Sequence, residues 1–189
     1  QSGFISEIGF EMYQKILNEA ILELHDTNPI ELDMADNSAL LLRDCLLETD
    51  VRAMLPTDYV SSVSERMSLY KELQGMKKEE EVEAFRKKLA DMFGPVPEEA
   101  QELLRTIPLR RKGAEMHLEK ISMKNGKLMA YFAPSINSPF YQSELFTRVL
   151  AFMQKNHPKV QIQEHNQKAV LTIHGVPTVK SAVHWLNQI

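Results

Sequence analysis

The sequence predicts an α+β fold in which helices pack on one face of a mainly antiparallel sheet. Residues 62–107 carry apolar residues at helical spacing, whereas residues 116–133 and 160–173 alternate apolar with polar residues around a short turn. Helices followed by antiparallel hairpins are typical of α+β domains and argue against a doubly wound parallel sheet. No glycine-rich loop follows a predicted strand, so the usual nucleotide-binding crevice is not expected.

Length and composition fit one globular domain with an appendage. The chain has 189 residues, of which 43% are hydrophobic, so it is long enough to bury a core. Apolar residues recur at helical spacing over residues 5–24, and Asn28-Pro29 ends that pattern. We therefore predict a linking helix with a short leading segment over residues 1–29 and the α+β domain over residues 30–189.

The sequence shows no signal for export or membrane insertion. No apolar run approaches the roughly 20 residues that span a bilayer, and the N-terminus lacks the charged-then-apolar pattern of a secretion signal. The single cysteine, Cys45, has no partner for an internal disulfide. We expect a cytoplasmic protein without a membrane partner. Because the first residue is Gln1 and not methionine, we also expect a piece of a longer protein.

Residues 30–55 give weak signals, although residues 30–34 and 45–51 each fit a strand. Four helical patterns follow. Ser62-x-x-Glu65 fits a capping box, and Gly75 lies where a left-handed residue ends many helices. The predicted buried stripe of this first helix consists of Val63, Met67, Tyr70 and Leu73.

The next helix is predicted to end at Gly94, and its apolar stripe consists of Val82, Phe85, Leu89 and Met92. Pro97 suits the first turn of a further helix. Pro108 lacks the backbone N–H that a helix interior needs, so we predict two short helices on either side of it.

Two hairpins, each followed by a helix, are predicted in the last third of the chain. Asn125-Gly126 is the strongest short hairpin signal, because both central positions of a type I′ turn need positive φ. Pairing Lys124 with Lys127 places the apolar residues of both strands on one face. The second hairpin turns at Asn166-Gln167, and the helices begin near Ser138-Pro139 and Pro177.

The sequence predicts no catalytic or metal site in this chain. Cys45 lies in an apolar run, where a free cysteine usually acts as a small buried hydrophobe. Residues 79–81 are three glutamates at a predicted helix start, where acids favour the helix dipole. His117 and Glu119 would share one face of a strand, as many surface pairs do. The six histidines show no metal-ligand spacing with Cys45.

The charge balance argues against direct DNA binding. The formal net charge is −4, whereas a domain that binds duplex DNA normally concentrates positive charge. The densest basic cluster comprises Arg105 and residues 110–112, and glutamates lie at similar density around it. We interpret this cluster as a solvated helix face.

Several segments carry a resemblance to one known family, and they lie in the family's order along the chain. They are Gln1-Ser2-Gly3 with Ile8-Gly9-Phe10, Leu55 to Val60, Arg66 to Lys71, and Asp91 to Pro97. This pattern resembles the C-terminal region of the bacterial transcription-repair coupling factors, preceded by the tail of their translocation motif.

The resemblance implies a noncatalytic, autoregulatory protein-interaction domain of an ATP-dependent DNA translocase that displaces stalled RNA polymerase and recruits excision repair. It implies that this piece folds back on the N-terminal UvrA-binding module of its own parent. UvrA, RNA polymerase, DNA, ATP and Mg²⁺ would then be bound by other parts of that parent. Gln1 matches the glutamine of the translocation-motif loop. The resemblance implies no cofactor for this fragment and no enzymatic activity of its own.

The candidate contact residues lie in one predicted helix. They are the basic run Arg86, Lys87 and Lys88 together with Asp91. Relatives often carry an acid three residues before the aspartate that Asp91 matches, and Lys88 stands there in this chain. The simpler alternative is that the basic run is a solvated helix face, paired with acids such as Glu83.

Two other functions stay open from the sequence. One is an auxiliary nucleic-acid-binding module of the same motor, which salt-sensitive DNA binding would support. The other is a small hydrolase built around Cys45, for which a turnover lost in Cys45→Ala would be needed.

Overall fold

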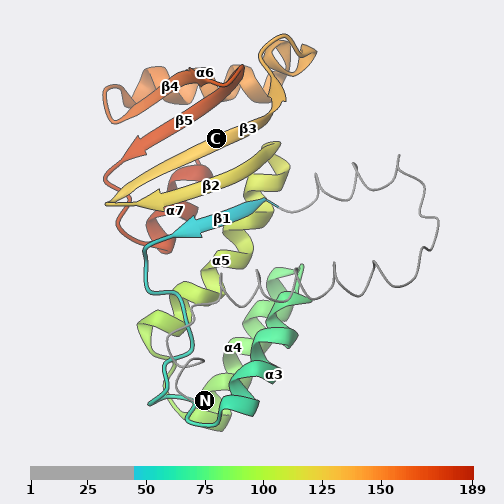
Figure 1. Cartoon of the computed structure of the whole chain (residues 1–189), viewed down its shortest axis with the longest axis vertical. Helices are drawn as coiled ribbons and strands as arrows, with labels where there is room; N and C mark the ends of the chain where they lie inside the picture. Colours follow the sequence, from blue (N-terminus) through green and yellow to red (C-terminus); the bar gives the residue numbers. More distant parts are fainter. Residues whose placement is uncertain (1–44) are drawn as a thin grey trace, which may run out of the picture. The chain divides into compact units, whose positions relative to one another are not determined.

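The computed structural model describes residues 45–189, which divide into two compact units (Figure 1). The helical unit comprises Arg52–Leu104, and the sheet unit comprises residues 45–51 and 105–189. The predicted boundary after residue 29, the helix over residues 5–24 and the possible strand over residues 30–34 lie outside the described residues.

The sheet unit contains a five-stranded sheet with the strand order β1-β2-β3-β5-β4. Only β1 and β2 run parallel, and every other neighbouring pair is antiparallel, so the predicted α+β class with a mainly antiparallel sheet is confirmed. The strands are β1 (Leu46–Thr49), β2 (Leu118–Lys124), β3 (Lys127–Ser135), β4 (Val160–His165) and β5 (Lys168–His174).

Both predicted hairpin registers are confirmed. Lys124 pairs with Lys127, and His165 pairs with Lys168. The turn residues adopt the positive φ that a type I′ turn requires, with values of 54° and 68° at Asn125-Gly126 and 50° and 60° at Asn166-Gln167. The two-residue turns therefore determine which side chains of all four strands face the core.

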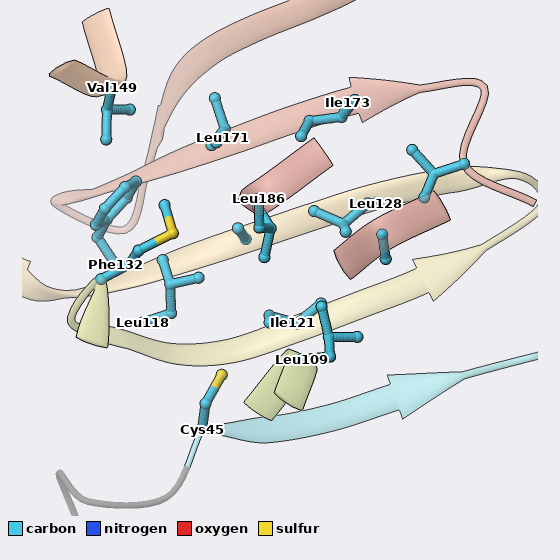
Figure 2. Packing of buried hydrophobic residues seen from close by; sticks show 14 of the residues in the cluster. Cys45, Leu109, Leu118, Ile121, Leu128, Phe132, Val149, Leu171, Ile173 and Leu186 are labelled. Carbon is cyan, nitrogen blue, oxygen red and sulfur yellow. The ribbon is translucent and has the colours of Figure 1, made fainter. Parts of the chain in front are cut away.

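The core of the sheet unit lies on one face of the sheet, beneath three helices (Figure 2). These helices are α5 (Glu98–Glu115), α6 (Glu144–Asn156) and α7 (Val179–Leu186). Residues spaced by two along the strands enter this core, as the alternating pattern predicts. The fully buried members from the central strands are Ile121, Leu128, Ala130, Phe132, Leu171 and Ile173.

Helix α6 begins later than predicted. Ser138-Pro139 does start a helical turn, but residues Pro139–Gln142 form a separate 3-10 turn that ends at Ser143. The Ser143 hydroxyl then accepts a hydrogen bond from the backbone N–H of Phe146 and caps α6 itself. Two capping serines close together explain the difference, because each of them starts its own helical segment.

Helix α5 contradicts the predicted break at Pro108, since it runs without interruption from Glu98 to Glu115. A proline inside a helix removes one backbone hydrogen bond and costs about 3 kcal/mol. Apolar residues are buried both before and after the proline, and this packing offsets the loss. They are Leu103, Leu104, Ile107, Leu109 and Met116.

The helical unit contains α3 (Val63–Gln74), α4 (Glu79–Phe93) and the first part of α5. Two predicted core residues are wrong here, because Val63 is 43% exposed and Met92 is 54% exposed. Gly75 is also not left-handed, since its φ is −78°. The stripe of α3 that is buried consists of Arg66, Leu69, Tyr70 and Leu73, so it includes a charged residue that the predicted apolar stripe did not contain.

Candidate protein-interaction site

Helix α4, which carries the four predicted contact residues, is fixed at both ends by local hydrogen bonds. The Glu81 carboxylate accepts hydrogen bonds from the backbone N–H groups of Lys77 and Lys78, at 2.8 and 2.9 Å. These bonds favour the charged carboxylate and lower the pKa of Glu81. At the other end Gly94, with a φ of 85°, stops the helix as predicted.

A loop before α3 holds the C-terminal end of α4. The Tyr59 hydroxyl lies 3.0 Å from the carbonyl oxygen of Leu89 and 2.9 Å from that of Gly94, and its single proton is shared between these two acceptors. Its ring meets the ring of Phe93 edge to face, with 5.7 Å between the centroids. Burial raises the pKa of Tyr59, so the hydroxyl stays protonated as a donor.

The same loop is attached to α3 by two buried side chains. The Tyr70 hydroxyl accepts a hydrogen bond of 2.9 Å from the backbone N–H of Leu55. Arg66 donates from Nη1 to the carbonyl oxygens of Val60 and Ser61. Burial raises the pKa of Tyr70, and the Leu55 N–H and the Arg66 charge partly oppose that rise. Hydrogen bonds thus connect the loop to both α3 and α4.

We expect Tyr59→Phe to lower the free energy of unfolding by about 1 kcal/mol, because the phenyl ring keeps the packing but removes the donor. Urea denaturation followed by circular dichroism measures the change. Tyr131→Phe is the matched control, since within residues 45–189 the Tyr131 hydroxyl has no hydrogen-bond partner other than the sulfur of Met129, at 3.9 Å. Equal losses in the two variants would contradict the proposed role of the Tyr59 hydroxyl.

The structure places all four predicted contact residues on α4 and leaves all four exposed. Arg86 and Lys88 lie on opposite flanks of the helix, because residues two apart are rotated by about 200°. Lys88 and Asp91 are three apart and share a flank. Lys87 lies between the flank of Arg86 and the flank of Lys88, on the side of the helix opposite the buried residues Phe85 and Leu89. Gln1, which was predicted to belong to the translocation-motif loop, lies outside the described residues.

The acids of the helical unit already neutralise two of the three cations. Arg86 forms an ion pair of 2.6 Å with Glu83, one turn earlier, and this pair lowers the pKa of Glu83. Lys88 forms an ion pair of 2.6 Å with Glu72 of α3. These pairs fit the alternative of a solvated helix face, and they leave Lys87 and Asp91 as the charges without an ion pair among the described residues.

A groove lies beside the flank that carries Lys88. It has a volume of about 480 Å³, and the Lys88–Glu72 ion pair forms part of its wall. The lining residues are Glu72, Gly75, Met76, Glu81, Ala84, Phe85 and Lys88. The contribution of α3 could not be predicted from the sequence, because Glu72 and Lys88 are 16 residues apart and no local pattern relates them. We define Lys88, Asp91 and this groove as the α4 flank.

The described residues, 45–189, show neither a metal-holding cluster nor a membrane-spanning helix. Over residues 45–189, no group of three or more histidine, cysteine or acidic side chains is placed to hold a metal ion. Within the same residues, no helix has the length and apolar character needed to cross a membrane. Cys45 is fully buried in the sheet core, as predicted for a packing residue, and His117 precedes β2 instead of lying in it.

Comparison with known proteins identifies one family. The family model described as the TRCF domain matches residues 49–143. The transcription-repair-coupling factor of Myxococcus xanthus is 33% identical over 131 residues, which are 68% of this chain and 9% of that protein. The protein of the same name from Rickettsia prowazekii (strain Madrid E) is 26% identical over 167 residues, or 88% of this chain and 14% of that protein. The chain therefore spans about a tenth of the length of these curated relatives.

The fold is shared with a solved structure. It is described as the crystal structure of the C-terminal domain of transcription-repair coupling factor, and it aligns with a TM-score of 0.62 at 16% sequence identity. The alignment covers 77% of this chain and 92% of the solved chain. Nearly the whole of that domain thus has a counterpart in the arrangement of helices and strands seen here.

Proposed function

The chain belongs to the TRCF domain family, and from this we propose that it is the C-terminal autoregulatory domain of a transcription-repair coupling factor. In this proposal the parent is a cytoplasmic, ATP-dependent DNA translocase that displaces stalled RNA polymerase and recruits UvrA. The present chain carries no catalytic step. It binds the N-terminal UvrA-binding module of its own parent and keeps that module covered until the motor engages polymerase.

The main support for this proposal is the geometry of the α4 flank. Exposed charges and a groove lie together on a helix that is fixed at both ends, so the surface is preorganised for a protein partner. A repressive contact must also be released, which limits its strength to a few kcal/mol. A small, polar surface of this kind suits that requirement better than a large apolar one.

Calorimetric titration of the chain with the UvrA-binding module of its parent tests the proposal. We expect Lys88→Glu to raise the Kd about tenfold, since it reverses a charge on the contact flank. The variant also has a second effect. It replaces the 2.6 Å ion pair between Lys88 and Glu72 by two neighbouring carboxylates, which repel each other. Loss of binding alone is therefore not sufficient evidence of contact.

The charge swap Glu72→Lys with Lys88→Glu separates the two effects, because it restores an internal ion pair while it reverses the charge at both positions. Reduced binding in both the single and the swapped variant supports direct contact through the α4 flank. Recovery in the swapped variant would mean that Lys88→Glu acts only through the fold. Arg86→Gln, on the opposite flank, is expected to change the Kd by less than about twofold. No binding by the unmodified chain overturns the proposal.

A further inference from the structure

Strand β4 forms an edge of the sheet. Among the described residues it pairs only with β5, and it lies at one end of the strand order, far from the α4 flank in sequence (Figure 1). An edge strand leaves backbone N–H and C=O groups without strand partners, and these groups attract another extended chain.

The register shows which backbone groups of β4 face outward. The carbonyl of Lys159 accepts a hydrogen bond of 2.9 Å from the N–H of His174 on the β5 side. In an antiparallel pair alternate residues face the partner, so Gln161, Gln163 and His165 also direct their backbone groups toward β5. The backbone groups of Val160, Ile162 and Glu164 consequently point away from β5.

Much of this edge is accessible. Val160 is fully buried, but Ile162 is half-buried and residues 163–165 are exposed. Natural edge strands are usually protected by charged side chains, above all lysine, by proline or by a bulge. Over Val160–His165 the sequence contains neither lysine nor proline, and its pairing with β5 has no register shift. Glu164 is the one acidic residue of this edge, so among the described residues the edge is open to a strand that places a basic residue opposite Glu164.

The side chains of β4 indicate what kind of strand fits. On the core face the edge presents Val160, Ile162 and Glu164 in succession, so a complementary strand offers two apolar residues and one basic residue at alternate positions. Glu164 has no ion pair within residues 45–189 to compete for that basic residue. A second copy of this chain fits poorly, because antiparallel pairing centred on Ile162 would place each Glu164 opposite a valine.

We propose that the outer edge of β4, at Ile162 to Glu164, binds an extended segment of a partner protein as an additional strand of the sheet. The segment runs antiparallel to β4 and carries alternating apolar side chains with a basic residue opposite Glu164. Backbone hydrogen bonds supply the attraction, and the alternate side chains supply the specificity. This surface belongs to the sheet unit, so it is independent of the function proposed for the α4 flank.

The capped peptide Lys-Thr-Val-Thr-Val is a direct probe, because its lysine falls opposite Glu164 and its valines fall opposite Ile162 and Val160. Titration into the ¹⁵N-labelled 189-residue chain is expected to shift the amide resonances of Ile162 and Glu164 in a saturable manner. The companion peptide Glu-Thr-Val-Thr-Val is expected to bind about tenfold more weakly, because it places two carboxylates opposite each other.

Glu164→Pro is the decisive variant. The N–H at position 164 points outward, so proline removes a donor that β5 does not use and blocks an added strand. Glu164→Ala is the matched control, because it keeps the backbone N–H and removes only the carboxylate. We expect Glu164→Pro to abolish the peptide-induced shifts and Glu164→Ala to retain them with weaker binding.

Three results would overturn the proposal. The first is the absence of saturable shifts at Ile162 and Glu164 in the unmodified chain. The second is equal peptide binding by Glu164→Pro and the unmodified chain, provided that the spectrum shows the variant to be folded. The third is a concentration-dependent dimer, seen by sedimentation and lost in Glu164→Pro, which would assign this edge to a second copy of the chain.

Discussion

Arg66→Ala is expected to lower the free energy of unfolding of the helical unit by about 3 kcal/mol, the largest effect that we predict for a single side chain here. Arg66 is only 7% exposed, and its guanidinium donates to the carbonyl oxygens of Val60 and Ser61. Alanine leaves two acceptors without this charged donor and opens a cavity beneath the loop before α3. Urea denaturation followed at 222 nm measures the loss of helical structure.

Two further variants of α3 serve as controls for Arg66→Ala. Lys71→Ala, on the exposed side of the same helix, is expected to change the free energy of unfolding by no more than about 0.5 kcal/mol. Arg66→Lys keeps the charge but replaces the forked donor by a single ammonium, so an intermediate loss is expected. A loss for Arg66→Ala no greater than that for Lys71→Ala would show that the loop does not depend on this side chain.

Gly113→Ala is expected to destabilise the sheet unit by about 2 kcal/mol, although alanine is the better helix former. A Cβ atom at position 113 would lie 2.7 Å from the sulfur of Cys45 and 3.0 Å from Cδ1 of Ile121. Both neighbours belong to the closed core of the sheet unit, so neither has free space into which it can move. The fluorescence of Trp185, which packs in the same unit, reports the unfolding in urea.

A double-mutant cycle identifies the atom responsible. Cys45→Ala removes the sulfur, so Gly113→Ala is expected to cost about 1 kcal/mol less in that background than in the unmodified chain. The effect will not vanish, because the Cβ of residue 45 and the Ile121 side chain would still lie 3.0 Å away. Additive losses would mean that the cysteine sulfur is not the limiting contact. The same cycle measures how much Cys45 contributes to the packing at this position.

The parts of the fold that were predicted correctly depend on local signals. Asn125-Gly126 and the residues at 166 and 167 determine two-residue turns, and each turn determines the register of both strands that it joins. The period of two then assigns the buried face without further information. The start of α3 at the capping residue Ser62 was predictable for the same reason, because the interaction lies within four residues of sequence.

Several of the incorrect predictions involve contacts that the apolar pattern of a single helix does not contain. Arg66 is buried because a loop supplies carbonyl acceptors for it, and an apolar pattern cannot represent such a residue. Pro108 is tolerated because residues on both sides of it are buried by other segments. The α4 flank was predicted only as a run of charges, since the pairing of Lys88 with Glu72 depends on how α3 and α4 pack. The contact residues themselves stay a prediction.

The internal ion pairs of the helical unit have a kinetic consequence. Charges that are neutralised by a neighbour within 2.6 Å, as Lys88 and Arg86 are, contribute little potential at distances beyond the Debye length. A partner that approaches α4 is therefore not steered by a strong field, and its association rate remains near the value of about 10⁵ to 10⁶ M⁻¹s⁻¹ that is typical of unsteered proteins. If the partner is tethered within the same polypeptide, this slow encounter is no obstacle, because the tether supplies a high local concentration. The α4 flank is thus better suited to a tethered partner than to one that must be captured from solution.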